Sequence, residues 1–201
     1  ERALTPIGQE LAKLPLDPRV ARMIVAARDE GCLKEVLIIA AALSVQDPRE
    51  RPQEKQGTAD AAHKKFADEK SEFLSWLKLW QWYHDEVEHK KSNRKLVQAC
   101  HANFLSALRM REWADIHSQL HGMAAEHGWV KANPPTPFPE KGAPASAQVV
   151  QVNDDSALGR PGGRMNDIPA NYDAIHRALL SGLLGNIGCK SEDSGHYLGA
   201  R

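Results

Sequence analysis

The stretch of residues 32–52, CLKEVLIIAAALSVQDPRERP, constrains the fold most because it predicts a helix that is apolar on both faces. One face carries Leu33, Val36, Leu37, Ala40 and Leu43, and the opposite face carries Ile38, Ile39, Ala41 and Ala42. Such a helix either spans a membrane or is packed from all directions in a core. The apolar run 36–45 is too short to cross a bilayer, so this helix needs a sizeable body of protein around it. We expect Asp47-Pro48 to end it, since the residue before a proline avoids the α region. Residues 49–52 are expected to form a short charged turn.

Two shorter helices are predicted ahead of this stretch. Thr5 and Asp17 each precede a proline, and a capping residue followed by proline at the first helical position favours a helix start. The first helix should end by Leu14-Pro15. The second should run to Glu30, with Gly31 as its C-terminal cap. Its expected buried residues are Val20, Met23, Ile24 and Ala27.

Further amphipathic helices are predicted between Thr58 and Gly128, and Ser92 or Asn93 is suited to cap one of them. The residues expected to face inward are Phe73, Leu77, Trp80, Tyr83, His84 and Val87 in one helix; Leu96, Cys100, Phe104 and Leu108 in the next; and Trp113, Ile116, Leu120, Met123 and His127 in the third. No strand pattern is convincing before Pro134. The predicted fold class is therefore mainly α, an antiparallel helical bundle.

Residues 133–169 are rich in proline and glycine and read as a linker that cannot bury enough apolar surface to order itself. Within it, residues 159–164 lack the Gly-Lys-Ser/Thr ending of a phosphate loop. A last helix follows, with inward residues Tyr172, Ile175, Leu179, Leu180 and Leu183. Gly185 and Gly188 should break that helix, and residues 196–199 are suited to begin a strand.

Composition limits the classes of function. Lys+Arg and Asp+Glu are both 26, so any contact with nucleic acid is expected to be local and weak by itself. The three cysteines lie far apart, which favours small buried thiols in a reducing compartment over a disulfide or metal site. No signal peptide or membrane-spanning run is evident, and we expect a cytoplasmic monomer. The missing initiator methionine leads us to expect a fragment of a longer protein.

Several segments resemble the helicase-associated region of DEAH-box RNA helicases, closest to the bacterial HrpA type. They are residues 4–8 (LTPIG) with 14–18 (LPLDP), residues 32–52, residues 104–120 (FLSALRMREWADIHSQL) and residues 172–201. They occur in the family's order. Residues 133–169 depart from the pattern, because the family joins the flanking units by a much shorter connection.

The resemblance implies a domain organisation. Residues 1–31 would be the C-terminal part of a winged-helix domain and residues 32–132 the helical bundle called the ratchet domain. Residues 133–169 would be an inserted linker, and residues 170–201 the start of a truncated OB-fold domain. An orphaned first strand of that barrel would lack ladder partners, so we expect residues 189–201 to be poorly ordered.

The resemblance also implies a function. The family's motor domains, which bind ATP and magnesium and lie ahead of this region, are absent here. The chain has no Walker loop, DEAH tetrad or arginine-finger motif, so it should hold no cofactor and be inactive alone. The parent would be an ATP-dependent RNA helicase. This module would form one wall of a channel for single-stranded RNA, next to the motor domains of the same chain.

Basic and aromatic residues are the candidates for RNA contact, because guanidinium forks match phosphate oxygens and exposed rings stack on bases. They are Arg49, Arg51, Lys55, Trp82, Arg109 and Arg111. The competing interpretation is salt bridges between domains, or ion pairs with Glu50, Glu54, Glu86, Glu88 and Glu112. For the basic run 90–95 we favour a solvated face. Trp80 and Trp113 lie on apolar faces and are better explained as core residues, and another domain is an equally good partner for an exposed Trp82.

Two other functions stay open at this point. Aromatic-rich helices and a neutral net charge also fit a protein-interaction scaffold that never contacts RNA. A small hydrolase would need a zinc site on His117 and His121, which are four residues apart on a helix. Ser118 stands where the family of zinc proteases has its glutamate, and no third ligand is evident.

Overall fold

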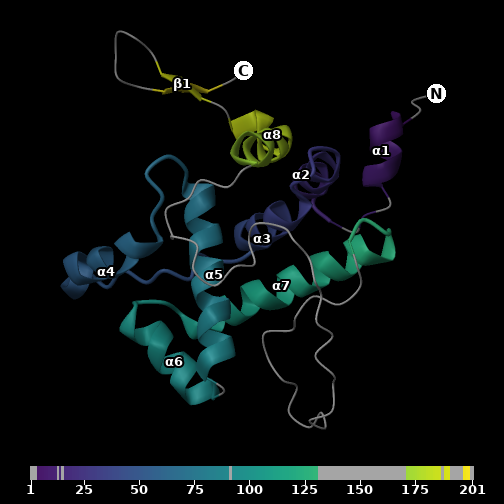
Figure 1. Ribbon diagram of the computed structural model, residues 1–201. Coiled ribbons are helices and arrows are strands. Elements are labelled where there is room, and N and C mark those ends of the chain that lie inside the picture. Colours follow the sequence, from purple (N-terminus) through teal and green to yellow (C-terminus); the bar gives the residue numbers. More distant parts are fainter. Residues whose placement is uncertain are drawn as a thin grey trace, which may run out of the picture. The chain divides into compact units, whose positions relative to one another are not determined.

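The computed structural model describes residues 4–12, 14, 16–90, 92–130, 171–186, 188–190 and 197–199 (Figure 1). The α-helices are α1 (Pro6–Leu11), α2 (Pro18–Asp29), α3 (Leu33–Leu43), α4 (Gln56–His63), α5 (Glu72–Lys90), α6 (Asn93–Ala102), α7 (Ala107–Glu126) and α8 (Tyr172–Gly182). Short 3-10 turns are η1 (Gln53–Lys55), η2 (Lys64–Phe66) and η3 (Leu184–Asn186). Strands β1 (Gly188–Lys190) and β2 (Tyr197–Gly199) are antiparallel. The mainly helical fold class is confirmed.

The chain forms two compact units, each described here by itself. Unit 1 contains the described parts of residues 1–48, 108–134 and 170–201, and is built on α1, α2, α3, α8 and α7 from Leu108 onward. Unit 2 is built on residues 49–107, which include α4, α5 and α6. Within unit 1, residues 171–182 pack with residues 18–43. The predicted domain types stay predictions.

Local capping signals set the limits of α1 and α2 as predicted. The Thr5 hydroxyl oxygen accepts a hydrogen bond from the Gly8 N–H at 3.2 Å, and an Asp17 carboxylate oxygen accepts one from the Arg19 N–H at 2.9 Å. Gly31 has φ +72°, which a glycine adopts without strain. Its N–H donates to Arg28 O, and the next N–H, of Cys32, donates to Ala27 O. These bonds make a Schellman motif that ends α2 at the predicted place.

Helix α3 is buried on most of its surface, as the apolar pattern predicts. Val36, Leu37, Ile39 and Ala40 have no exposed area, whereas Leu43 is 44% exposed, so its predicted core position is wrong. The helix also ends earlier than predicted, at Leu43. There the Ser44 hydroxyl donates to Ala40 O at 2.8 Å, so Asp47-Pro48 is not the stop.

Residues 49–52 are extended, and the predicted turn is wrong. Arg49 pairs with Leu105 in an isolated antiparallel bridge, and the Glu50 N–H donates to Phe104 O at 2.8 Å. Phe104 has φ +52° and takes the place of a glycine in the Schellman motif that ends α6. Helix α6 therefore stops at Ala102, and Leu108, predicted to face inward on the same helix, belongs to α7 and is 64% exposed.

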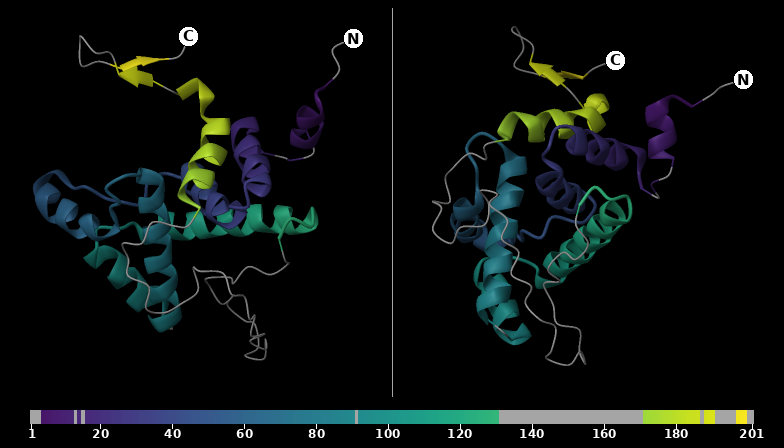
Figure 2. Two further views of the ribbon diagram at one scale, coloured as in Figure 1. Left: turned by 45° about the horizontal axis from the view of Figure 1, so that its top comes forward. Right: turned by 45° about the vertical axis from the view of Figure 1, so that its right-hand side comes forward.

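In unit 1, α8 lies along α2, as the views in Figure 1 and Figure 2 agree. Ile175 and Leu179 of α8 are buried, whereas Leu180 is 46% exposed, contrary to the prediction. Arg177 donates to both carboxylate oxygens of Glu30, at 2.7 to 3.2 Å. Asn171 Nδ2 donates to the buried Glu35 carboxylate at 3.0 Å. Polar contacts thus join α8 to the C-terminal end of α2 and to α3.

Helix α7 partly follows the predicted seam. Trp113 and Leu120 are buried, Ile116 and Met123 are half-buried, and His127 is exposed, so its predicted inward position is wrong. Gly128, with φ +71°, follows the end of the helix as predicted. The indole Nε1–H of Trp113 donates to Ile38 O at 2.9 Å. Trp113 therefore joins α7 to α3 within unit 1.

The C-terminal strand has a partner, contrary to the expectation of an orphan. Strand β2 pairs with β1 in a register that places Leu198 opposite Cys189. The linker prediction for residues 133–169, including the sequence at 159–164, lies outside the described residues. So do residues 191–196, 200 and 201, which leaves the expectation of poor order at the C-terminus a prediction.

In unit 2, α5 buries a stripe shifted from the predicted one. Its buried residues are Leu74, Ser75, Trp76, Leu79, Trp80 and Tyr83. Phe73, Leu77, His84 and Val87 are half-buried. The shift arises because aromatic residues occur on both sides of α5, so apolar spacing alone does not define one face.

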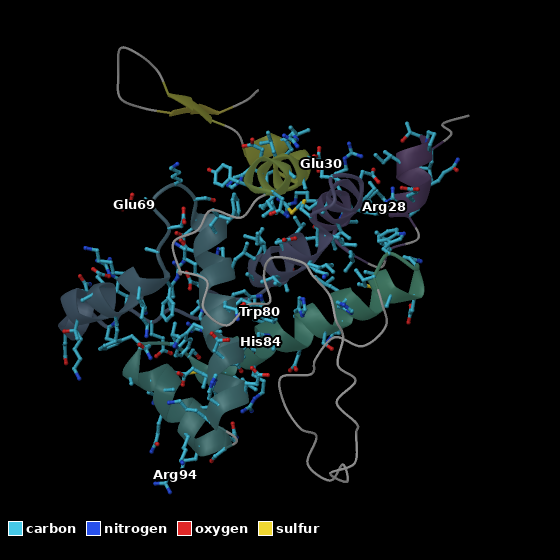
Figure 3. All side chains as sticks on the ribbon, in the orientation of Figure 1. Arg28, Glu30, Glu69, Trp80, His84 and Arg94 are labelled. Carbon is cyan, nitrogen blue, oxygen red and sulfur yellow. The ribbon has the colours of Figure 1, made fainter. Side chains whose placement is uncertain are left out.

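Acidification is expected to destabilise the protein through His84, whose ring lies against Trp80 with centroids 4.5 Å apart (Figure 3). Burial lowers the pKa of His84, against the smaller opposing effects of Asp85 and Glu88. The unfolded chain then binds the extra proton more readily. Neutral His84 contributes its full share to folding stability above its ordinary pKa of 6.5. That share is lost as the pH falls below 6.5 toward the lowered pKa of the folded state.

Urea unfolding at pH 7 and pH 5 measures this effect. His84→Phe keeps a ring against Trp80 and should flatten the pH dependence, whereas the control His89→Phe, at an exposed position of the same helix, should leave it intact. Equal pH dependence in the wild type and His84→Phe would assign the effect to other groups.

Candidate nucleic-acid interface

Three of the six predicted contact residues gather around α4 in unit 2. Arg51 precedes η1, Lys55 ends η1, and the Trp82 ring packs edge-on against Phe66 of η2 with centroids 5.2 Å apart. Turns η1 and η2 flank α4 on either side in the sequence. We use the name α4 face for the residues that lie on the segments flanking α4 or contact them: Arg51, Lys55, Lys64, Lys65 and Trp82. It combines cations with an aromatic ring, the side chains that single-stranded nucleic acid binds.

Arg51 is an exposed cation of the α4 face and has a defined partner. Its Nε and Nη2 each lie 2.7 Å from one oxygen of the Asp60 carboxylate. The side chains are 60% and 48% exposed, respectively. Hydrogen bonding to Arg51 lowers the pKa of Asp60, and His63 adds a smaller electrostatic effect in the same direction. The Arg51 guanidinium is therefore already oriented to donate to two acceptor oxygens at once.

Lys64 and Lys65 extend the α4 face, and sequence reasoning missed them. Lys65 Nζ lies 5.1 Å from the Trp82 ring centroid and 4.8 Å from that of Phe66, and it donates to the Asn103 side chain. Burial lowers the pKa of Lys65. The available signal was the run His63-Lys64-Lys65 at the end of a helix. Trp82 is half-buried under this lysine, so it is less open than its helical position predicted.

Arg49 is held inside unit 2. Its side chain is 25% exposed, and its Nη2 lies 2.6 Å from Glu72 Oε1. The guanidinium also stacks over Trp76, 4.6 Å from the ring centroid. These contacts tie the extended segment 49–52 to α5, so burial and pairing both limit the availability of Arg49 to a strand.

Arg109 and Arg111 lie on α7 in unit 1. Arg109 Nη1 donates to Asp47 O at 3.0 Å, which ties α7 to the segment after α3. Both arginines are half-buried. Of the predicted acidic partners, Glu86 pairs with Lys90 at 2.9 Å, one turn away on α5. Arg49 and Arg51 instead pair with Glu72 and Asp60, which the sequence analysis did not name.

Groups suited to catalysis are sparse in the described residues. The His117 and His121 rings lie 6.1 Å apart, and burial lowers the pKa of His121, with a further contribution from Lys34. Within the described ranges, no three or more His, Cys, Asp or Glu side chains are grouped to hold a metal ion. Cys32 and Cys100 are buried free thiols whose pKa burial raises to about 11, which disfavours the reactive thiolate.

None of the helices in the described part of the chain has the length and apolar character to span a bilayer.

Comparison with known proteins gives one family match and several long relatives. The model of the helicase associated domain (HA2), ratchet-like, matches residues 17–106. The ATP-dependent RNA helicase HrpA homolog of Haemophilus influenzae is 41% identical over 201 residues, which is 100% of this chain and 13% of the relative. The ATP-dependent RNA helicase HrpA of Escherichia coli is 40% identical over 198 residues, 98% of this chain and 12% of the relative.

A more distant relative shares a shorter stretch. The pre-mRNA-splicing factor ATP-dependent RNA helicase prp22 of Schizosaccharomyces pombe is 32% identical over 120 residues, 60% of this chain and 10% of the relative. The chain therefore spans 13% or less of the length of these three relatives.

Proposed function

This chain belongs to the helicase-associated (HA2), ratchet-like region of HrpA-type DEAH-box helicases, and from that premise we propose that it guides single-stranded RNA for the motor of a longer enzyme. The observation that carries the proposal is identity of about 40% along the whole chain to proteins named as ATP-dependent RNA helicases. In this proposal the module forms one wall of the RNA channel. The motor domains of the same chain bind ATP and Mg²⁺ and supply the hydrolysis.

The proposal also covers the domains on either side of the bundle and the oligomeric state and location of the enzyme. Residues before α3 complete a winged-helix domain, and the β1–β2 pair opens an OB-fold domain. The parent acts as a cytoplasmic monomer.

Contacts to backbone phosphates suit such a wall, because they carry no sequence information and let the strand slide. The cations of the α4 face in unit 2 and Arg109 and Arg111 in unit 1 are the proposed contacts. Buried anchors such as Trp113, whose indole is bonded to α3, keep α7 rigid while the motor opens and closes.

Removing the guanidinium groups of α7 is expected to weaken RNA stimulation. In the full-length protein, Arg109→Ala with Arg111→Ala should raise the RNA concentration needed for half-maximal ATP hydrolysis by about tenfold or more, because charge-assisted hydrogen bonds are lost. Hydrolysis without RNA should be unchanged. The control, Arg94→Ala with Lys95→Ala, removes the same charge from exposed positions of α6 and should have a smaller effect. Wild-type stimulation in the α7 variant would exclude these two residues.

The burial of Arg49 against Glu72 and Trp76 is an observation that favours the scaffold as a second candidate. Titration of the full-length protein with fluorescent single-stranded RNA at low and high salt separates the two functions. An RNA guide loses affinity as salt rises, since each phosphate contact on a single strand adds about 0.7 to the slope of log affinity against log salt. A scaffold shows no salt-dependent RNA affinity.

A further inference from the structure

On the α4 face, the Asp60 carboxylate occupies the donors of Arg51 that a phosphate group would take. Arg51 Nε and Nη2 each donate to a different oxygen of one carboxylate, both at 2.7 Å. A phosphate presents paired oxygens that match the same fork. We propose that Asp60 is an internal competitor for RNA: the carboxylate holds Arg51 while no strand is bound, and an RNA phosphate displaces it. This inference rests on the proposed function.

The exposure of the pair makes the exchange feasible. With side chains 60% and 48% exposed, Arg51 and Asp60 are both reached by solvent, and ion pairs in such positions are weak and easily replaced. The Asp60 carboxylate that is released returns to water, so its desolvation does not oppose exchange. An incoming phosphate finds the guanidinium in its bidentate orientation, which reduces the ordering that binding requires.

Arg49 shows how a different environment excludes the same role. Its side chain is only 25% exposed and is stacked on Trp76 as well as paired with Glu72. Glu72 is 59% exposed, so the difference lies in the cation: a phosphate would have to reach a guanidinium that is mostly covered and stacked on Trp76. Of the two arginines in segment 49–52, Arg51 is therefore the one that can change partner. Lys55 and Lys64 are both exposed and flank α4 in the sequence, so each adds a positive charge next to that helix.

The test measures RNA affinity of the full-length protein with a short fluorescent oligouridylate at low salt. Asp60→Asn removes the competing charge and keeps the shape of the side chain. We expect it to tighten RNA binding by roughly two- to fivefold, the strength of an exposed ion pair. The matched control is Glu54→Gln on η1, an exposed position that removes one negative charge without touching the fork. Both substitutions are repeated with Arg51→Ala.

Competition predicts that Asp60→Asn gains more affinity than Glu54→Gln and that Arg51→Ala abolishes the extra gain. An equal gain in the two variants, or a gain that survives Arg51→Ala, would show a general effect of charge and overturn the inference. Weaker binding by Asp60→Asn, with thermal unfolding unchanged, would make Asp60 a positioning residue and overturn it too.

A further outcome separates this inference from the proposed function. If Arg51→Ala binds RNA as the wild type does while Arg109→Ala with Arg111→Ala is impaired, only the competition is overturned. If the wild-type protein has no salt-dependent RNA affinity, that result contradicts the proposed function and, with it, the inference that Asp60 competes with RNA.

Discussion

Replacing Trp113 with alanine is expected to lower the free energy of unfolding by about 3–5 kcal/mol, the largest effect of any single change we consider. Trp113 is fully buried, and its indole donates to Ile38 O of α3 at 2.9 Å. The substitution removes the ring, leaves a cavity between α7 and α3, and takes away a hydrogen bond. Urea unfolding followed by far-ultraviolet circular dichroism measures the loss without depending on the deleted fluorophore.

Trp113→Phe separates packing from hydrogen bonding. The smaller ring fills much of the space but cannot donate, so we expect a cost of about 1–2 kcal/mol. If Trp113→Ala cost less than Trp113→Phe, or under about 1 kcal/mol, burial of this indole would not be what fixes α7 in unit 1.

Replacing Gly182 with alanine is expected to destabilise unit 1 by about 1–3 kcal/mol through overpacking. A Cβ atom at Gly182 would lie 2.4 Å from the Arg19 carbonyl oxygen and 2.6 Å from Met23 Cγ. The first of these is backbone of α2 and cannot rotate away. Helix α8 would have to move off α2, which strains the Arg177–Glu30 pair and exposes Ile175 and Leu179.

The sign of this effect is diagnostic, because alanine is normally favoured over glycine in a helix by about 0.5–1 kcal/mol. Gly122 on α7 provides the matched control, since nothing lies within 4 Å of the Cβ atom it would gain. Gly122→Ala should therefore stabilise the protein by about that amount, as measured by urea unfolding. Gains of equal size in the two alanine variants would contradict the close packing of α8 on α2.

Sequence-local features were predictable where residues act on their own neighbours. The caps at Thr5, Asp17, Gly31 and Gly128 all occur where the sequence places them, because a cap depends only on the few residues around it. The family was also readable, since its segments keep their order through the chain, and the HA2 match confirms it.

Predictions that needed a second segment were less accurate. The end of α6 depends on Phe104, whose carbonyl oxygen accepts from the Glu50 N–H at 2.8 Å and lies 3.0 Å from His63 Nε2. These contacts hold the bulky Phe104 at φ +52°, a backbone conformation that residues other than glycine rarely adopt. Segment 49–52 became extended for the same reason, because it pairs with residues that follow α6.

The candidate site shows the same difference between features that neighbouring residues set and features that distant segments set. Sequence identified Arg49 and Arg51 as guanidinium groups suited to phosphate, since that chemistry belongs to the side chain. It could not distinguish them, because their difference comes from Trp76 and Glu72 on α5 in one case and Asp60 on α4 in the other. Partner choice depends on which distant segments meet.

The amino-acid sequence by itself determined the helical class, the starts of α1 and α2 and the family, because each rests on local propensity or on residues shared in order with relatives. Only the tertiary structure decided that α8 joins α2, that Arg49 is enclosed and that Arg51 stays exposed. Those outcomes depend on burial and on contacts between residues far apart in the chain, and apolar spacing along one helix does not encode which surface will cover it.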